Sequence, residues 1–164
     1  MNIDYLKPLT EKFIRKNKNK INWKKISKYQ KLNENFIREF QDEVDWFFIS
    51  CYQKLSEEFI REFQDKVDWY WISSNQILSE EFIREFQDKV DWNWISEYQK
   101  LSEKFIREFQ NKMNWNCLLE KYKYNLSFKN NKYQIKSANY NSDCLEYNEF
   151  IDLVLRLISL KLFK

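Results

Sequence analysis

The sequence predicts an all-α fold: a short α-solenoid of five two-helix repeats, followed by a small C-terminal β-hairpin and a capping helix. A block of 23 residues, which reads LSEEFIREFQDKVDWYWISSNQI in its clearest copy, occurs five times in succession. Each copy carries two helix-start signals, and its apolar residues recur at helical spacing. A fixed period of about 20–50 residues is typical of arrays in which each repeat buries a face against its neighbours.

The period divides the chain into a lead-in, an array and a C-terminal cap. The lead-in covers residues 1–8, and the cap covers 124–164. The five repeats are 9–31, 32–54, 55–77, 78–100 and 101–123. The first repeat has Lys and Asn in place of most acidic residues, which is expected of a terminal capping repeat.

The first helix of each repeat begins at a polar cap, as the third copy illustrates. The Ser56 hydroxyl is placed to accept from the backbone amides two and three residues later. Leu55 and Ile60 flank this cap as a hydrophobic staple. The apolar residues that follow, up to Val67, fall within about 100° of arc and predict an amphipathic helix of about ten residues.

The second helix begins in the same way, with Asp68 as its cap, and runs from Trp69 to about Gln76. Trp69 and Ile72 lie on its predicted buried side. Other copies extend that side with a tyrosine, namely Tyr29, Tyr52 and Tyr98. Helices of this length do not persist alone in water, so their stability must come from stacking on neighbouring repeats.

The C-terminal cap has a different pattern. Alternating apolar residues around Asn130-Asn131 predict a β-hairpin over about 125–136, and residues 138–142 are expected to form a loop. Asp143 and Glu146 form a capping-box start for a last helix over about 144–163. We expect this apolar helix to close the open end of the stack, with its outer face available to a partner chain.

The composition excludes several classes of site. The chain has no Gly and no His, so it lacks a Gly-rich phosphate loop, the commonest general base and the commonest metal ligand. We therefore expect no cofactor, no metal site, no catalytic residue and no enzymatic activity. The carboxylates at Asp45, Asp68 and Asp91 are interpreted as helix caps. The three cysteines are expected to be free thiols in a reducing compartment; they are Cys51, Cys117 and Cys144.

The location and the charge pattern bear on partners. The polar, Lys-rich start carries no signal-peptide pattern, and no segment is apolar over a membrane-spanning length, so we expect a cytoplasmic protein of a bacterial or virus-infected cell with no membrane partner. Residues 1–31 carry a net charge of +8, residues 32–100 carry −9, and residues 101–164 carry +4. The basic start has two interpretations: a solvated cap, or a site that grips phosphates.

The two residues after each Trp vary most between copies. A helical wheel places them on the outward side of the second helix, where repeat proteins acquire distinct ligands. The candidate partner-binding residues are therefore Lys24, Lys25, Phe47, Phe48, Tyr70, Trp71, Asn93 and Trp94. Two interpretations are open: the aromatic members complete the core by packing on the next repeat, or they form a ridge that binds a partner.

The FIRE segment recurs unchanged in four copies. Its arginines are Arg38, Arg61, Arg84 and Arg107. Arg61 can pair with Glu57 or Glu58 at helical spacing, so a solvated, ion-paired face is expected. Recent duplication would also leave such residues identical.

The string LSEEFIREFQDKVDW, followed two residues later by IS, resembles tandem repeats in uncharacterised proteins of giant viruses, phages and AT-rich bacteria. The resemblance covers residues 9–123. It implies a helical repeat fold and no established activity, so it assigns no catalytic residue.

Three functions compete at this point. The preferred hypothesis is a non-enzymatic scaffold that binds another protein. In a phage-type protein, such a scaffold would inhibit a host defence nuclease by placing its acidic helices in a basic nucleic-acid channel. The alternative is direct nucleic-acid binding through the basic ends and stacked aromatic residues. An enzyme is the least favoured, and the oligomeric state is left open.

Overall fold

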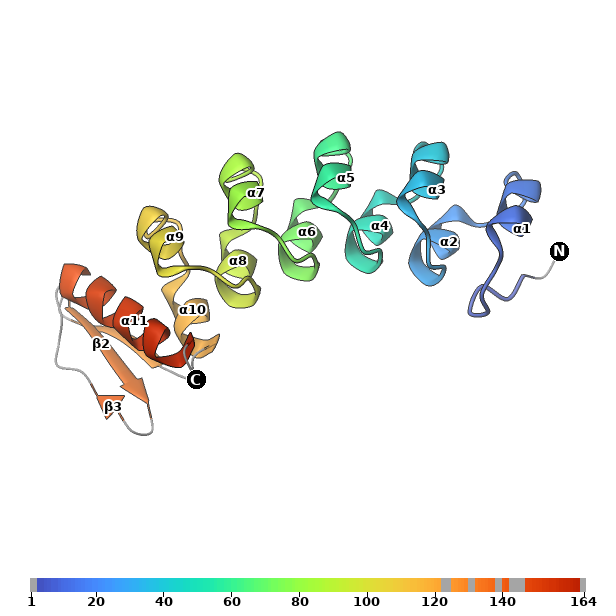
Figure 1. Ribbon diagram of the computed structural model, residues 1–164. Coiled ribbons are helices and arrows are strands. Elements are labelled where there is room, and N and C mark those ends of the chain that lie inside the picture. Colours follow the sequence, from blue (N-terminus) through green and yellow to red (C-terminus); the bar gives the residue numbers. More distant parts are fainter. Residues whose placement is uncertain (1–2, 122–124, 130–131, 138–139, 142–146, 163–164) are drawn as a thin grey trace. The chain divides into compact units, whose positions relative to one another are not determined.

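The computed structural model describes residues 3–121, 125–129, 132–137, 140–141 and 147–162. Eleven helices and one three-stranded sheet lie in these residues, so the all-α solenoid with a C-terminal hairpin and a last helix is confirmed (Figure 1). The chain forms two compact units, Met1–Leu78 (unit 1) and Ser79–Lys164 (unit 2). Each unit is described by itself.

Unit 1 contains three helix pairs, one pair per repeat. The helices are α1 (Glu11–Lys16), α2 (Trp23–Tyr29), α3 (Glu34–Glu39), α4 (Trp46–Tyr52), α5 (Glu57–Glu62) and α6 (Trp69–Asn75). Figure 1 shows the odd-numbered helices in one row and the even-numbered helices in a second row. Along the second row, α4 packs against both α2 and α6.

The predicted caps start the helices. The Ser56 hydroxyl accepts from the Phe59 amide at 3.2 Å at the start of α5. The Asp68 carboxylate accepts from the Tyr70 amide at 3.1 Å at the start of α6. Each cap satisfies a backbone donor that has no partner within its own helix. The two helix starts of each repeat are therefore local properties of the sequence.

The first helix is shorter than predicted. In place of about ten residues, α5 has six and is followed by a tight turn from Phe63 to Val67. The Phe63 carbonyl accepts from the Lys66 amide at 2.9 Å and from the Val67 amide at 3.0 Å. The Trp69 indole N–H donates to the Gln64 carbonyl at 2.9 Å. α5 therefore ends where this hydrogen-bonded turn begins, and the turn buries Phe63 and Val67.

The apolar core runs between the two rows of helices. Phe59, Ile60 and Ile72 are fully buried in the third repeat. The Trp46 ring lies 4.9 Å from the Phe63 ring and 6.2 Å from the Phe59 ring, centroid to centroid, and Trp23 contacts Phe36 and Phe40 likewise, so the first two repeats pack their Trp on the phenylalanines of the next. Burial of each such side chain contributes roughly 1.5–3 kcal/mol.

A buried polar ladder also joins the repeats of unit 1, and the sequence reasoning missed it. Gln53 is 6% exposed, and its side-chain amide makes three hydrogen bonds, one to the first residue of its own repeat and two to the preceding repeat. It accepts from the Leu32 amide at 3.0 Å and donates to the Ser27 and Gln30 carbonyls at 3.0 and 2.9 Å. These carbonyls lie at the C-terminal end of α2, where the helix supplies no donor.

The buried serines form a second part of this ladder. The Ser27 hydroxyl donates to the Trp23 carbonyl at 2.8 Å and accepts from the Asp45 amide of the next repeat at 2.9 Å. Ser50 bonds Trp46 and Asp68 in the same way. Each hydroxyl therefore links the second helix of one repeat to the N-cap of the next.

The lead-in takes the place of a preceding repeat. Gln30 donates to the Tyr5 and Lys7 carbonyls at 2.7 and 3.2 Å and accepts from the Leu9 amide at 2.7 Å. The Tyr5 hydroxyl accepts from the Asn22 amide at 2.8 Å. The first glutamine of the ladder therefore finds its partners in the lead-in.

Unit 2 contains two more helix pairs, a sheet and the last helix. Its elements are α7 (Glu80–Glu85), α8 (Trp92–Tyr98), α9 (Glu103–Glu108), α10 (Trp115–Lys121), β1 (Asn125–Lys129), β2 (Lys132–Ser137), β3 (Tyr140–Asn141) and α11 (Tyr147–Leu162).

The predicted hairpin is present, and the sheet is larger than predicted. β1 and β2 are antiparallel, with Asn125 opposite Lys136 and Lys129 opposite Lys132. The two asparagines between them lie outside the described residues. The expectation of a loop over 138–142 is wrong in part, because β3 pairs with β2 through its Tyr140. A two-residue strand has too little alternation to stand out in a sequence.

The last helix closes the end of unit 2, as predicted. α11 packs on α9 and β2, and its Phe150 is fully buried. The Phe150 ring lies 4.5 Å from the Tyr133 ring and 5.3 Å from the Trp115 ring, centroid to centroid. The capping residues predicted at Asp143 and Glu146 lie outside the described residues.

Candidate functional site

The residue that directly follows each Trp is exposed in every repeat. Phe47 is 46% exposed and Tyr70 is 45% exposed, while Lys24 is also exposed. The next residue along the chain is half-buried at Phe48 and Trp71. The outward direction predicted for these pairs is therefore correct for their first member and partly correct for their second.

The aromatic members of the pairs contact one another across repeats. The Phe47 ring meets the Trp71 ring edge-on at 5.8 Å and the Phe48 ring at 5.1 Å. Tyr70 meets Trp71 edge-on at 5.1 Å. These contacts join α4 to α6 and still leave two rings almost half exposed. The rings thus pack between repeats, as the first interpretation expects, and leave an exposed surface, whose binding of a partner stays a prediction.

The tyrosines near the ends of the second helices are exposed, in contrast to the prediction. Tyr29, Tyr52 and Tyr98 were predicted on the buried side, but they are 45%, 54% and 54% exposed. The buried side of these helices is formed instead by Ile26 and Ser27 in α2 and by Ile49 and Ser50 in α4, which are all fully buried. Tyr52 stacks on Phe48 at 5.9 Å and so belongs to the same surface. We call the surface of Phe47, Phe48, Tyr52, Tyr70 and Trp71 the aromatic ridge.

The equivalent positions in unit 2 are more polar. Asn93 is exposed, and its side-chain amide oxygen accepts from the Asn114 side chain at 2.6 Å. Trp94 is half-buried and stacks on Tyr98 at 5.4 Å. Within unit 2, the candidate residues Asn93 and Trp94 therefore contribute one aromatic contact, between Trp94 and Tyr98, beside hydrogen-bonded side-chain amides. The larger aromatic surface belongs to unit 1.

A groove lies beside the aromatic ridge, at the C-terminal ends of α2 and α4. It has a volume of about 410 Å³ and is lined by Lys28, Tyr29, Gln30, Lys31, Leu32, Tyr52, Gln53 and Lys54. A second hollow, of about 220 Å³, shares Lys28 and Tyr29 and adds Asn22, Lys24, Lys25 and Phe48. We call the first of these the lysine–tyrosine groove. The two candidate residues Lys24 and Lys25 line the second hollow.

Lysine side chains lie on the aromatic rings of this region. The Lys28 ammonium lies 5.1 Å from the Tyr29 ring centroid, 5.5 Å from that of Phe48 and 5.9 Å from that of Tyr52. The Lys24 ammonium lies 5.4 Å from the Phe48 centroid. Such cation–π contacts hold the ammonium groups on the ring faces at little cost in solvation.

The two rows of helices in unit 1 differ in their content of acidic residues. The even-numbered helices α2, α4 and α6 read WKKISKY, WFFISCY and WYWISSN and carry no Asp or Glu over their described lengths. The odd-numbered helices α1, α3 and α5 read EKFIRK, ENFIRE and EEFIRE. The acidic residues of the repeats in this unit thus lie on the odd-numbered helices, in the turns that follow them and at the N-caps of α4 and α6.

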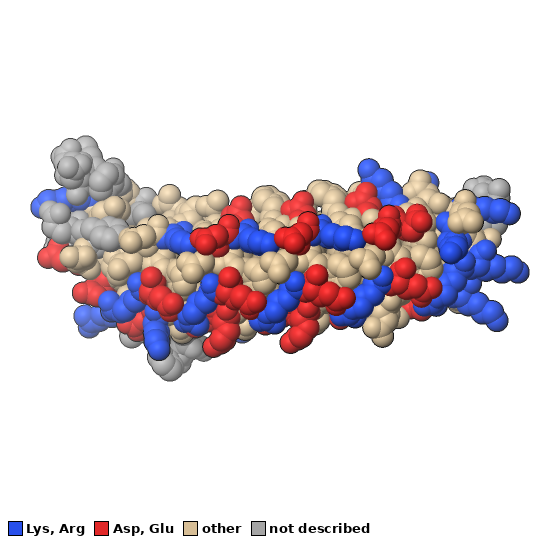
Figure 2. Space-filling model, turned by 90° about the horizontal axis from the view of Figure 1, so that it is seen from above, with Lys and Arg blue, Asp and Glu red and all other residues tan. Residues whose placement is uncertain are grey.

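The FIRE segments form an ion-pair ladder on the odd-numbered helices. Arg15 pairs with Glu39 of the next repeat at 2.9 Å, and Arg38 pairs with Glu62 at 2.7 Å. The same guanidinium of Arg38 lies 4.9 Å from the Phe59 ring centroid. Hydrogen bonds to Glu39 and then to Glu11 raise the pKa of Arg15. Figure 2 shows the resulting rows of alternating charge. The predicted ion-paired face is confirmed, and it also links successive repeats.

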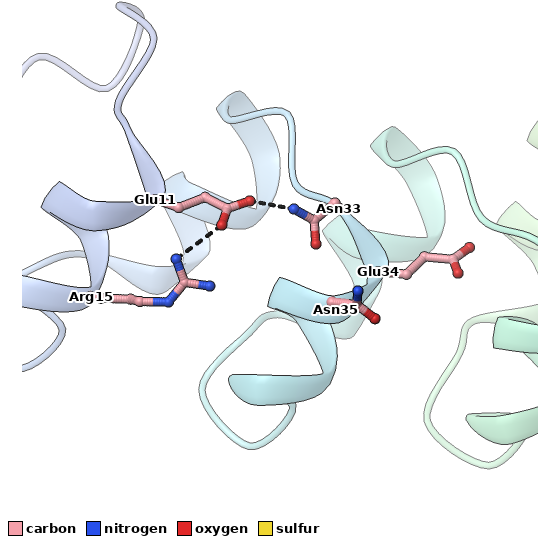
Figure 3. A pocket seen from close by; sticks show the side chains of 5 residues that line it. All are labelled: Glu11, Arg15, Asn33, Glu34 and Asn35. Carbon is pink, nitrogen blue, oxygen red and sulfur yellow. Dashed lines mark hydrogen bonds and ion pairs between the residues drawn. The ribbon is translucent and has the colours of Figure 1, made fainter.

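An open hollow on this row is part of the ladder. It has a volume of about 550 Å³ and is lined by Glu11, Arg15, Asn33, Glu34 and Asn35. Figure 3 shows the Glu11 carboxylate between its two partners, Arg15 at 2.9 Å and the Asn33 side-chain amide. Because its charged groups already bind one another, the hollow has a structural role.

The described residues offer little for chemistry. No three Cys, Asp or Glu side chains in them come together as a metal site would require. Every buried side-chain nitrogen or oxygen in this part of the chain has a hydrogen-bond partner. Burial, followed by the charges of Glu97 and Glu120, raises the pKa of the Cys117 thiol, which makes it a poorer nucleophile. No helix in the described ranges has the length and apolar character needed to cross a membrane.

Comparison with known proteins gives no relative: no family model, no curated protein and no solved structure matches this chain.

Proposed function

We propose that the chain is a non-enzymatic scaffold that binds another protein through the aromatic ridge of unit 1. The observation that carries the proposal is the exposure of Phe47, Tyr52 and Tyr70, which are 46%, 54% and 45% accessible on packed neighbouring helices. Aromatic side chains offer about 150–250 Å² each, so these three expose roughly 250 Å² of ring surface. The type of residue, more than the area, supports a binding role, because aromatic side chains are enriched at the centres of protein interfaces.

The rigidity of the ridge supports this proposal. Its rings contact one another within and between α4 and α6, at centroid distances of 5.1–5.9 Å. The helices beneath are joined by the buried Gln and Ser ladder. A surface that is ordered before binding loses little conformational entropy on binding, and this increases its affinity for a partner of matching shape.

The polar groups of unit 1 support a scaffold over an enzyme. The N-cap carboxylates Asp45 and Asp68 accept from backbone amides, and the Arg and Glu residues of the FIRE segments bind one another. None of these groups faces a hollow with its charge unbalanced, as an acid–base catalyst would.

The nuclease-inhibitor version of this function remains a hypothesis about the partner. The inhibitor predicted from the sequence would place the acidic helices in the channel of the nuclease, which requires free carboxylates on these helices. The glutamates of the ladder are instead paired with arginines, as Glu39 is with Arg15 and Glu62 with Arg38. The ridge, therefore, rather than the acidic helices, is the surface we expect such a partner to contact.

Affinity capture with matched variants tests the proposal. Purified chain is used as bait in a lysate of its native host, beside the double variant Phe47→Ser/Tyr70→Ser and the control Lys12→Ser/Glu58→Ser, whose residues are exposed on α1 and α5. We expect one protein to be retained by the wild-type chain and the control and lost by the ridge variant. Retention of the same proteins by all three chains would refute the role of the ridge, provided that their circular dichroism spectra agree.

A further inference from the structure

The lysines around the lysine–tyrosine groove have no acidic partners. In the described residues, no carboxylate forms an ion pair with Lys24, Lys25, Lys28, Lys31 or Lys54. Elsewhere in unit 1, Arg15, Arg38 and Lys66 do form ion pairs. Five uncompensated positive charges around hollows that share Lys28 create a local potential that attracts polyanions.

The groove also offers ring surface one repeat apart. Tyr29 and Tyr52 occupy equivalent positions in successive repeats, both line the groove, and they are 45% and 54% exposed. Exposed rings that alternate with lysines are what proteins use to bind single-stranded nucleic acid, because every base has a π face and every phosphate a charge.

The hydrogen-bond state of the groove favours nucleic acid over an acidic peptide. The amides of Gln30 and Gln53 line it, yet both are already bonded to backbone groups of the ladder. The groove is flanked by the helices α2 and α4 and not by a β-strand, so a peptide main chain would find no strand edge to extend. A single strand of nucleic acid, which is held by phosphate charge and base stacking, does not depend on such an edge.

We infer that the lysine–tyrosine groove binds single-stranded nucleic acid without sequence preference. The lysines contact phosphates, and Tyr29 and Tyr52 stack on bases. This site goes beyond the proposed protein-binding function and uses residues outside the exposed part of the ridge, apart from Tyr52. The even-numbered helices favour it further, because they place no carboxylate beside the path of the phosphates.

Fluorescence anisotropy on the full chain tests the inference. The probes are fluorescein-labelled single strands of 20 nucleotides, as DNA and as RNA, a duplex of equal length and an acidic peptide of poly-Glu. We expect both single strands to bind more tightly than the duplex and the peptide. Three to five phosphate contacts give a slope of about −2 to −3.5 in a plot of log affinity against log salt concentration.

Three variants separate the possible causes of binding. Lys28→Gln/Lys31→Gln/Lys54→Gln is expected to reduce the salt slope by about 2. Its control, Lys12→Gln/Lys16→Gln/Lys104→Gln, removes the same charge from exposed positions on α1 and α9 and should leave the slope unchanged. Tyr29→Ala/Tyr52→Ala should weaken binding at least about tenfold with the slope unchanged, since stacking carries no charge.

Several outcomes would overturn the inference. These are tighter binding of poly-Glu than of either single strand, equal losses in the groove variant and its charge-matched control, or no measurable binding at low salt. The Phe47→Ser/Tyr70→Ser variant should keep nucleic-acid binding, so the groove and the protein-binding ridge can fail independently.

Discussion

Gln53→Leu is the substitution that tests how the repeats are joined. The change keeps the approximate volume of a side chain that is 6% exposed and removes its amide. Three backbone groups then lose their partner: the Leu32 N–H and the Ser27 and Gln30 carbonyls, which now lie 2.9–3.0 Å from the Gln53 amide.

The size of the effect follows from these three bonds. A hydrogen bond contributes about 0.5–1.5 kcal/mol net, but a buried group left without a partner costs about 1–3 kcal/mol. Water can reach part of the region, because the lysine–tyrosine groove opens beside Gln53. We therefore expect the free energy of unfolding to fall by about 3–5 kcal/mol, among the largest effects of a single substitution.

Urea unfolding followed by circular dichroism measures this loss, and amide hydrogen exchange locates it. The neighbouring Lys54→Ala is the control, because this side chain is exposed and should change stability by less than about 0.5 kcal/mol. We expect the Leu32 amide to lose most of its protection in the Gln53 variant. A loss of stability below about 1 kcal/mol, with the Leu32 amide still protected, would refute the role of the buried glutamine and serine ladder in joining the repeats.

Three further predictions follow from the same contacts. Arg38→Ala removes a pair with Glu62 whose side chains are 34% and 45% exposed, so urea unfolding should show a loss of only about 0.5–1 kcal/mol, less at 1 M salt; a loss above 3 kcal/mol would contradict this. Burial, and then Lys100, lower the pKa of Lys121 from 10.5, so the folded state binds its proton less tightly than the unfolded state. Stability should therefore rise as pH increases toward 10.5, and Lys121→Met should reduce that rise; an unchanged pH dependence would show that Lys121 is not the cause. Cys117, with its raised pKa, should react with iodoacetamide at pH 8 more slowly than free cysteine, as mass spectrometry of its peptide can follow, and an equal rate would count against its burial.

The features that the sequence predicted correctly are those with local causes. Ser56 and Asp68 cap their helices within three residues, and β1 pairs with β2, which follows it closely in the sequence. The repeat length and the staggered apolar residues also follow from neighbours along the chain. Such features need no knowledge of which side chains meet across repeats.

The features that were missed depend on contacts between repeats. Gln53 and Ser27 are polar, and polar residues are exposed in most proteins, so their burial could not be read from type alone. Their recurrence at equivalent places in four copies was the available signal. Tyr52 was placed in the core by its angle on the helical wheel, yet the buried side of α4 is formed by Ile49 and Ser50, and the Tyr52 ring lies outside it.

The candidate site was predicted in outline only. Phe47 and Tyr70 were expected to be outward, and their exposures of 46% and 45% agree. The groove was not predicted, because it brings together Lys28 and Lys54 from successive repeats. Only the stacking of α2 on α4 places their charges on one surface.

Site-specific photo-crosslinking tests the central claim most directly, namely that the face of the even-numbered helices contacts the partner. Benzoylphenylalanine is placed at Tyr70 on α6 or, as a control, at Glu58 on the ion-paired row, and each chain is irradiated with the captured partner. We expect a crosslinked product from position 70 and none from position 58. A product from position 58 alone would contradict the account and move the binding surface to the FIRE ladder.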